Sequence, residues 1–464
     1  MSTAPTARRL AAAAALVTGL GLAACDAGAE RPGRPGEPDR PAAAVVLGEP
    51  GRDWEVRAAD IVPNGRFVPL APVGDDEAGD PAGVVVGDVL VAAVADEGAE
   101  DAAPLLVGIT GDGEVRWRGR GYGACWSPDD VALYCTRGTA LVRVDPETGG
   151  AGARADVTPA PGDAPVLDDG VLYVVVTPPG ADEDAYPPPF AVAALDAETL
   201  ERRWSADAGG LAELRGLGAG SPALDLTGPN VSVAAWRETR FGQADASQLE
   251  LDRETGSVLS TTHLGKGAFL ERPWTVRRGF GNDRLAVSRD GQPLLELSGQ
   301  PWDSRDGRLT TPEGLVGVGP ALYDATTGEA VWERPDLGDE LSGWRWTADR
   351  AQVAVTGFDP KAGEMTTTYL DARTGETQWT GAGSDVAPAE TPDAFVQVRT
   401  DHSSSWVVEA LDRDTGEVAW SRDVTPVGRA GNEDGLAIGG PYVSTGTVWA
   451  LGATTLVGFT DFPD

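Results

Sequence analysis

The residues best suited to chemistry lie in one short stretch, Leu411 to Trp420, which reads LDRDTGEVAW. It places an aspartate carboxylate, a threonine hydroxyl and an aromatic ring at fixed spacing, a combination that could move a proton or hold a substrate. The pattern recurs, however, and in each full copy the tryptophan falls eight residues after the aspartate: Asp196/Trp204, Asp324/Trp332, Asp371/Trp379 and Asp412/Trp420. Because a catalytic site is not needed several times in one chain, the stretch is interpreted as a structural repeat.

The elements around the copies indicate an all-β protein. Weaker copies lie at 144–150 and 251–257, and each unit has short apolar runs bounded by Gly, Asp and Pro. No window keeps a helical period over three turns, so we predict about four short strands per unit. The units span 83–118, 121–156, 163–207, 220–264, 272–335, 344–382, 393–424 and 435–459.

Units of this size cannot bury their own faces and must stack on one another. Radial stacking in a β-propeller leaves only short, protected edges, so we expect a propeller of eight four-stranded blades, with seven or nine as alternatives. Within 272–335, the run 284–297 is a candidate for an extra unit. The last unit has no Asp-Thr-Gly turn, and Asp53 to Arg57 is interpreted as its missing outer strand. An N-terminal strand is therefore expected to close the last blade.

The repeat resembles the PQQ-like β-propeller repeat of quinoprotein dehydrogenases and their non-catalytic relatives. The shared form Ala-Leu-Asp-x-x-Thr-Gly-x-x-x-Trp matches Ala194–Trp204, Ala410–Trp420 and, less fully, Tyr369–Trp379, and the resemblance covers about residues 52–460. It implies a PQQ-like propeller in which the motif is scaffold.

Three kinds of residue in the motif receive structural roles. The aspartates are expected to accept backbone N–H bonds across the turn, and the glycines to adopt a left-handed conformation. The tryptophans are expected to pack between neighbouring blades. In the copy at 195–204, Leu200 replaces the glycine. The residues concerned are Asp196, Asp324, Asp371 and Asp412; Gly328, Gly375 and Gly416; and Trp204, Trp332, Trp379 and Trp420.

The N-terminus has the pattern of a secretory signal. Arg8 and Arg9 precede an apolar run from Leu10 to Ala24, which is short for a membrane-spanning helix. Its end, Leu-Ala-Ala-Cys, resembles the bacterial lipobox, which implies lipid attachment to Cys25 and cleavage before it. We expect a signal peptide at 1–24, a lipidated, disordered tether at 25–51 and the propeller at 52–464.

Two cysteines remain, Cys125 and Cys135, and they flank a segment that can fold as strand, turn and strand. An exported chain meets an oxidising environment, so a disulfide across this hairpin is expected. A metal site is not predicted, because the only histidines, His263 and His402, are far from these cysteines in the sequence. His402 lies in a polar stretch that is typical of a solvated turn.

The net charge of −35 excludes nucleic acid as a partner and disfavours adsorption to anionic lipid. Acidic clusters at 75–77, 96–101 and 182–184 lack the ligand spacing of a known calcium loop. They are interpreted as exposed loops.

Catalysis is not predicted. Relatives that are quinoprotein dehydrogenases carry adjacent cysteines against the quinone, and this chain has neither a Cys-Cys pair nor a Cys-x-x-Cys-His haem site. No cofactor is therefore expected. Several aromatic residues would suit a binding rim, with packing between blades as the alternative: Trp274, Trp302, Trp344, Trp346, Tyr186 and Phe241.

Together these patterns predict a lipid-anchored, extracytoplasmic PQQ-like propeller that serves as a non-catalytic protein-interaction scaffold at the cell envelope. In fold it resembles the propeller lipoprotein of the β-barrel assembly machinery, and an envelope protein is the expected partner. The alternatives are a PQQ-dependent oxidoreductase and a surface protein that binds glycans or small ligands. Fold alone does not choose among them.

Overall fold

A computed structural model gives the fold, and contacts divide the chain into one unit at 1–40 and another at 41–464. The first unit lies outside the described residues. The structure describes residues 49–70, 83–99, 103–160, 164–178, 190–208, 223–226, 229–238, 244–266, 268–271, 274–278, 284–289, 292–298, 302, 314–337, 341–359, 364–383, 388–400, 406–424, 441–444, 446–460 and 462.

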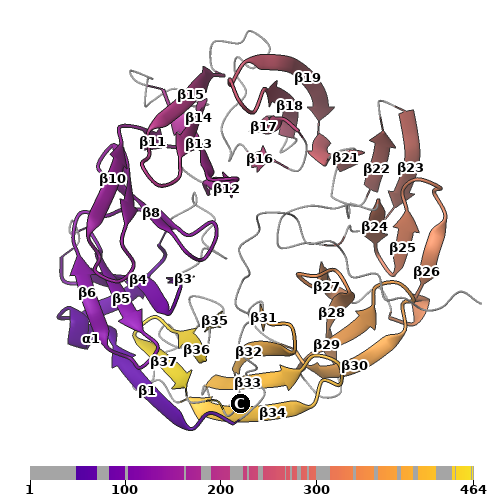
Figure 1. The fold of residues 1–464 in the computed structure, drawn as a ribbon. Coiled ribbons are helices and arrows are strands. Elements are labelled where there is room, and N and C mark those ends of the chain that lie inside the picture. The colour runs from indigo at the N-terminus through magenta and orange to yellow at the C-terminus, as the bar shows by residue number, and fades with distance from the viewer. Residues whose placement is uncertain are drawn as a thin grey trace, which may run out of the picture. The chain divides into compact units, whose positions relative to one another are not determined.

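The described residues form nine antiparallel sheets, numbered here in chain order from sheet 1 to sheet 9 (Figure 1). In sheet 1, β2 (Gly65–Val68) and β3 (Gly83–Val86) both pair with β4 (Val89–Asp96), followed by β5 (Leu105–Thr110) and β6 (Val115–Gly119). Sheet 2 contains β7 (Cys125–Trp126), β8 (Leu133–Arg137), β9 (Ala140–Val144) and β10 (Ala151–Ala155). In sheet 3, β11 (Thr158–Pro159) and β12 (Val166–Asp168) pair with β13 (Val171–Thr177), followed by β14 (Ala191–Asp196) and β15 (Arg202–Asp207). Sheet 4 contains β16 (Ala223–Asp225), β17 (Val231–Glu238), β18 (Ala244–Leu251) and β19 (Val258–Lys266).

The later sheets follow the same order, with neighbours in sequence paired in space. Sheet 5 contains β20 (Ala268–Glu271), β21 (Trp274–Arg278), β22 (Arg284–Arg289) and β23 (Gln292–Ser298), and sheet 6 contains β24 (Leu315–Val318), β25 (Ala321–Asp324) and β26 (Ala330–Glu333). Sheet 7 contains β27 (Leu341–Trp346), β28 (Gln352–Asp359), β29 (Glu364–Asp371) and β30 (Thr377–Ala382). Sheet 8 contains β31 (Ala389–Glu390), β32 (Ala394–Thr400), β33 (Trp406–Asp412) and β34 (Val418–Val424). Sheet 9 joins β35 (Tyr442–Ser444), β36 (Thr447–Leu451) and β37 (Thr455–Thr460) to β1 (Arg52–Arg57). The described helices are short, α1 (Ala58–Ile61) and the 3-10 helix η3 (Pro335–Leu337).

Two sequence predictions about the sheets have different outcomes. The closing strand is confirmed, because β1 pairs antiparallel with β37 over its whole length, from Arg52 opposite Thr460 to Arg57 opposite Thr455. The described residues, however, form nine sheets where eight units were expected. The difference arises at 272–335, where β21, β22 and β23 belong to sheet 5 and β24 to β26 form sheet 6. Sheet 5 has no Asp-Thr-Gly turn to mark it in the sequence.

Consecutive sheets pack on one another, in most cases through a shared apolar core. Central strands such as β13, VLYVVVT, are buried on both faces because a neighbouring sheet covers each face. Shared clusters join sheets 1 to 4 in sequence and sheets 5 to 9 in sequence, and β20 of sheet 5 contacts β18 and β19 of sheet 4. Sheet 9 returns to sheet 1 through a cluster that includes Val56, Trp449 and Leu90. This closed succession of antiparallel sheets is the predicted β-propeller.

Candidate functional site

The repeated turn between the third and fourth strands is held by its aspartate. In sheet 7, Asp371 Oδ1 accepts the backbone N–H groups of Arg373 at 2.9 Å and Thr374 at 2.7 Å. The N–H of Gly375 donates to the Asp371 carbonyl at 2.8 Å, and Gly375 has φ +70°, a conformation that glycine adopts without strain. The carboxylate therefore stabilises the turn through Oδ1.

The same arrangement recurs in five other sheets. In each, the carboxylate accepts the N–H groups of the second and third residues after it, and the residue four positions on donates its N–H to the aspartate carbonyl. The aspartates are Asp145, Asp196, Asp252, Asp324 and Asp412. The glycine positions carry Gly149, Leu200, Gly256, Gly328 and Gly416, all with positive φ.

The tryptophan of one sheet contacts this turn in the following sheet. Trp332 Nε1–H of sheet 6 donates to the carbonyl of Ala372 in sheet 7 at 3.0 Å, and its indole lies against Gly375. We call the interface between two consecutive sheets a seam. An indole N–H donates to a turn carbonyl in the same way at four more seams: Trp54 to Gly111, Trp117 to Pro146, Trp204 to Arg253 and Trp379 to Arg413. In each pair the indole packs on a glycine of the receiving turn: Gly113, Gly149, Gly256 and Gly416. The turn and the tryptophan therefore form one joint between sheets.

At the seam between sheets 2 and 3, different residues replace the packed tryptophan and glycine. Sheet 2 has Ala153 where its neighbours have tryptophan, and sheet 3 has Leu200 where they have glycine. Leu200 is buried and belongs to the core cluster on which Ala153 packs. Tyr134 Oη–H donates to the Ala197 carbonyl at 2.9 Å, the acceptor that an indole uses elsewhere. A tyrosine and a leucine thus replace the tryptophan and the glycine, a substitution that sequence spacing does not reveal.

Arginine follows the aspartate in two of these turns, and both side chains cross a seam. Arg413 Nη2 lies 2.7 Å from Asp349 Oδ1 of sheet 7, while Nη1 donates to the Thr391 carbonyl at 3.0 Å. Its guanidinium also lies over the Phe395 ring, 5.0 Å from the centroid. Arg253 makes the corresponding ion pair with Asp168 of sheet 3. Sequence spacing does not predict these pairs, because the carboxylate that pairs with each arginine lies far away in the sequence and cannot be identified from the turn alone.

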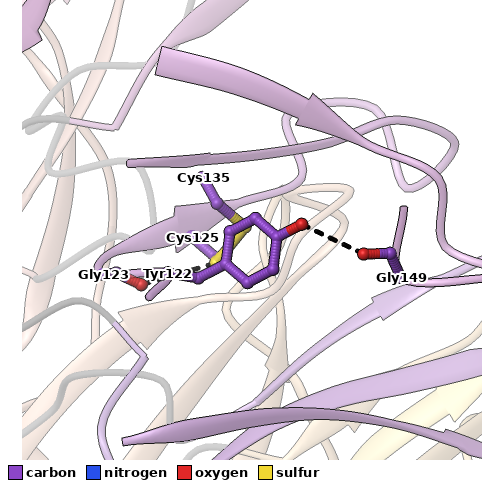
Figure 2. The surroundings of a disulfide bond; sticks show 5 residues. All are labelled: Tyr122, Gly123, Cys125, Cys135 and Gly149. Carbon is purple, nitrogen blue, oxygen red and sulfur yellow. Dashed lines mark hydrogen bonds between the residues drawn. A yellow bond between two sulfur atoms is a disulfide. The ribbon is translucent and has the colours of Figure 1, made fainter. Parts of the chain in front are cut away.

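The predicted disulfide joins Cys125 on β7 to Cys135 on β8, which lie directly opposite each other (Figure 2). Both cysteines are buried in the core between sheets 1 and 2. Tyr122 lies beside the bridge in Figure 2, and its hydroxyl donates to the Gly149 carbonyl at 3.0 Å. Because its sulfur atoms are excluded from solvent, the bridge is placed to staple the sheet and poorly placed to exchange with external thiols.

Two ionisable groups at the joints, Asp196 and Tyr369, have pKa values shifted away from neutral pH. Hydrogen bonds from Arg203, and then from the Thr199 backbone and hydroxyl, hold the pKa of Asp196 well below its usual range. Burial raises the pKa of Tyr369 to about 12, and its ring stacks on Trp379 with centroids 3.9 Å apart. Near pH 7 the Asp196 carboxylate therefore stays ionised and the Tyr369 hydroxyl stays protonated, so neither is suited to proton exchange.

Three of the aromatic residues considered for a binding rim pack inside the protein instead. Trp302, Trp344 and Trp346 are 1%, 8% and 3% exposed. Trp302 and Trp344 stack with centroids 4.9 Å apart, and Trp302 also contacts Trp332 and Trp346. The rim hypothesis is therefore wrong for these three residues, which fill the seam between sheets 6 and 7. Trp274 lies on β21, whereas Tyr186 and Phe241 lie outside the described residues.

Other sequence predictions fall largely outside the described part of the chain. These are Cys25 with the signal peptide, His402, the acidic clusters at 75–77 and 182–184, and two residues of the cluster at 96–101. Among the described residues, no group of three or more His, Cys, Asp or Glu side chains is arranged to hold a metal ion. The described helices include none with the length and apolar character needed to cross a membrane.

The fold and its repeated joints define a β-propeller, and part of its sequence matches a family model of PQQ-like repeats. Residues 106–259 match a family model described as "Outer membrane protein assembly factor BamB". No curated protein matches the chain.

Solved structures with a similar fold include two quinohemoprotein alcohol dehydrogenases. The enzyme from Comamonas testosteroni is 11% identical, with a TM-score of 0.46, and the match covers 91% of this chain and 78% of that one. The enzyme from Pseudomonas putida HK5 is 13% identical, with a TM-score of 0.41 and coverage of 86% and 79%. Sqt1 from Saccharomyces cerevisiae is 10% identical, with a TM-score of 0.39 and coverage of 90% and 100%. These likenesses assign no activity to the chain.

Proposed function

We propose that the protein is a non-catalytic scaffold at the cell envelope, held by a lipid on Cys25 and exposed on the extracytoplasmic side, where it binds another envelope protein. The observation that carries this proposal is the match of residues 106–259 to the family described as an outer membrane protein assembly factor. The matched segment includes β5 to β18, which form whole sheets 2 and 3 and parts of sheets 1 and 4.

The contacts of the repeat residues support a scaffold role. The carboxylates that a catalytic interpretation would need, such as Asp371 and Asp412, are engaged by backbone N–H groups of their own turns. The aromatic residues at the matching position, such as Trp332 and Trp379, are buried between sheets. Residues committed to joints build a rigid frame, and on such frames binding is usually carried by the loops.

The N-terminal sequence supports the location. The Leu-Ala-Ala-Cys motif ending at Cys25 follows a basic and apolar leader, and the buried disulfide suits a chain that folds in an oxidising space. A lipid on Cys25 would keep the propeller at a membrane surface. Replacing Cys25 with Ala should move the protein from the membrane fraction to the soluble extracytoplasmic fraction, and continued membrane retention would contradict the anchor.

The partner is sought by crosslinking on intact cells followed by mass spectrometry. The full-length protein is compared with an unrelated globular domain attached to the same residues 1–51, which controls for proximity at the membrane. With a carboxylate-reactive reagent, chosen because the chain is rich in Asp and Glu, we expect crosslinks from the propeller to a specific envelope protein that the control does not capture. Recovery of the same proteins by the full-length chain and the control would argue against a scaffold.

The oxidoreductase alternative is tested separately on the purified protein. PQQ and calcium are added, and both the absorption spectrum and dye reduction with simple alcohols are recorded. The proposed function predicts no shift of the quinone spectrum and no reduction above a sample of free PQQ. Saturable quinone binding with dye reduction would replace the scaffold with an enzyme.

A further inference from the structure

The propeller closes within sheet 9, which packs against sheet 8 and pairs a strand from the N-terminal part of the chain with strands from its C-terminal part. The outer strand β1 comes from the N-terminal side, whereas its partner β37 comes from the C-terminal side. The two strands are therefore not joined by a peptide turn. The joint used at five other seams, a tryptophan on a turn of the next sheet, has no such turn to receive it here.

Trp420 of sheet 8 packs on the C-terminal side of the closure instead. It is 4% exposed, and its ring centroid lies 5.4 Å from that of Phe459 on β37 and 5.7 Å from that of Phe462. The Trp420 indole thus packs on two phenylalanine rings of the C-terminal segment.

Arg422, two residues further along the same strand, holds the N-terminal side. Its Nη2 lies 2.7 Å from Glu49 Oε1 and donates to the Pro50 carbonyl at 3.4 Å. Pro50 is buried, although it precedes the first strand. One strand, β34, therefore contacts both sides of the closure.

The position of the Arg422 contact matters because β1 is anchored at its other end. The N–H of Ala58, directly after β1, donates to the Thr454 carbonyl at 2.9 Å, which fixes the C-terminal end of the strand to sheet 9. The end at Arg52 is held to sheet 9 by its pairing with Thr460, and the ends of edge strands fray first. Arg422 holds the residues immediately before this end.

We propose that β34 is a latch for the propeller, in which Arg422 keeps the free end of β1 paired with β37 and Trp420 keeps β37 itself in place. Opening of the propeller then begins when β1 separates from β37, starting at the Arg52 end of β1. A lifted β1 exposes the hydrogen-bonding edge of β37, the kind of edge that pairs with a strand from another chain. The latch thus controls how often that edge is available.

Hydrogen exchange followed by mass spectrometry on the full-length protein tests the latch. The Arg422→Gln variant should speed exchange in peptides that cover 52–57 and 455–460 by about five-fold, an effect near the upper end of what an exposed ion pair contributes. Peptides from β13 and β14 of sheet 3 should exchange at the wild-type rate. Unchanged exchange at β1 and β37, or equal acceleration in every sheet, would overturn the proposal.

Two further variants sharpen the result. Glu49→Gln should accelerate the same peptides, and the double variant should not exceed Arg422→Gln by more than measurement error, because Arg422→Gln already breaks the contact with Glu49. Arg154→Gln serves as the matched control, since it removes an exposed arginine–aspartate pair, Arg154 with Asp156 at 2.9 Å, at an outer strand away from the closure. It should leave β1 and β37 unaffected, and acceleration there in this control would also overturn the proposal.

Discussion

The indole of Trp332 lies so close to Gly375 of the next sheet that a Cβ on Gly375 would stand 2.6 Å from Trp332 Cδ2. Glycine is required here for two reasons: its φ of +70° is unfavourable for other residues, and the Trp332 indole occupies the space where a Cβ would lie. The turn and the indole therefore fit only as a pair. This pairing explains why the motif keeps glycine and tryptophan in successive units while their neighbours vary.

Replacing Gly375 with Ala should destabilise the fold more than the same change at a glycine with equal φ and free space. The left-handed conformation costs an alanine about 1–2 kcal/mol, and displacing the indole adds about 1–3 kcal/mol. Gly170, with φ +69° and no atom within 4 Å of its added Cβ, is the matched control and should show the first cost alone. Urea unfolding of both variants measures the difference, and equal losses would contradict the pairing.

The seam between sheets 2 and 3, where Tyr134 and Leu200 replace the tryptophan and the glycine, allows a second prediction. Tyr134→Phe should lower the free energy of unfolding by about 1–3 kcal/mol, because the Ala197 carbonyl loses its buried donor. Adding Ala153→Trp and Leu200→Gly to that variant should restore part of the loss by installing the joint of the other seams. Each added change made alone should destabilise, since an indole introduced by Ala153→Trp would meet the Leu200 side chain, and Leu200→Gly would leave a cavity. A triple variant no more stable than the sum of its parts would argue against this interpretation.

The disulfide should contribute to stability without affecting the fold. Replacing Cys125 and Cys135 together with Ala should lower the free energy of unfolding by about 2–3 kcal/mol, as expected for releasing a ten-residue loop. The far-ultraviolet circular dichroism should stay that of a β protein. Both proteins are best compared in the Cys25→Ala background, so that no free thiol remains in the double variant. An unchanged unfolding midpoint would show that the disulfide does not stabilise the hairpin.

Features encoded within a few residues can be predicted, whereas features that depend on the placement of distant segments cannot. The turns around Asp371 and the hairpin at Cys125 are local, and the outer strand β1 is identifiable because the last unit lacks its own. Sheet 5 escapes the count of units because it has no Asp-Thr-Gly turn, although 284–297 is a candidate for an extra unit. The ion pair of Arg413 with Asp349 and the packing of Trp344 depend on which sheets are neighbours, and single-sequence patterns carry no such pairing.

The hydrogen-bonded turn carboxylates should make the protein less stable at low pH, and part of this loss can be assigned to Asp412. The backbone N–H and hydroxyl of Thr415 lower the pKa of Asp412 below its ordinary value of 3.8 in the folded protein. As the pH falls, the unfolded chain takes up this proton first, so the contribution of Asp412 is complete above about pH 4 and is lost as the pH falls through the lower folded pKa. Asp412→Asn removes the charge and with it this dependence. The difference in unfolding temperature between wild type and variant should therefore be largest near pH 6 and shrink toward pH 2. Asp423→Asn, a change on β34 outside the turn, is the control, and a wild-type–Asp412→Asn difference that stayed constant with pH would show that the turn does not depend on the ionised carboxylate.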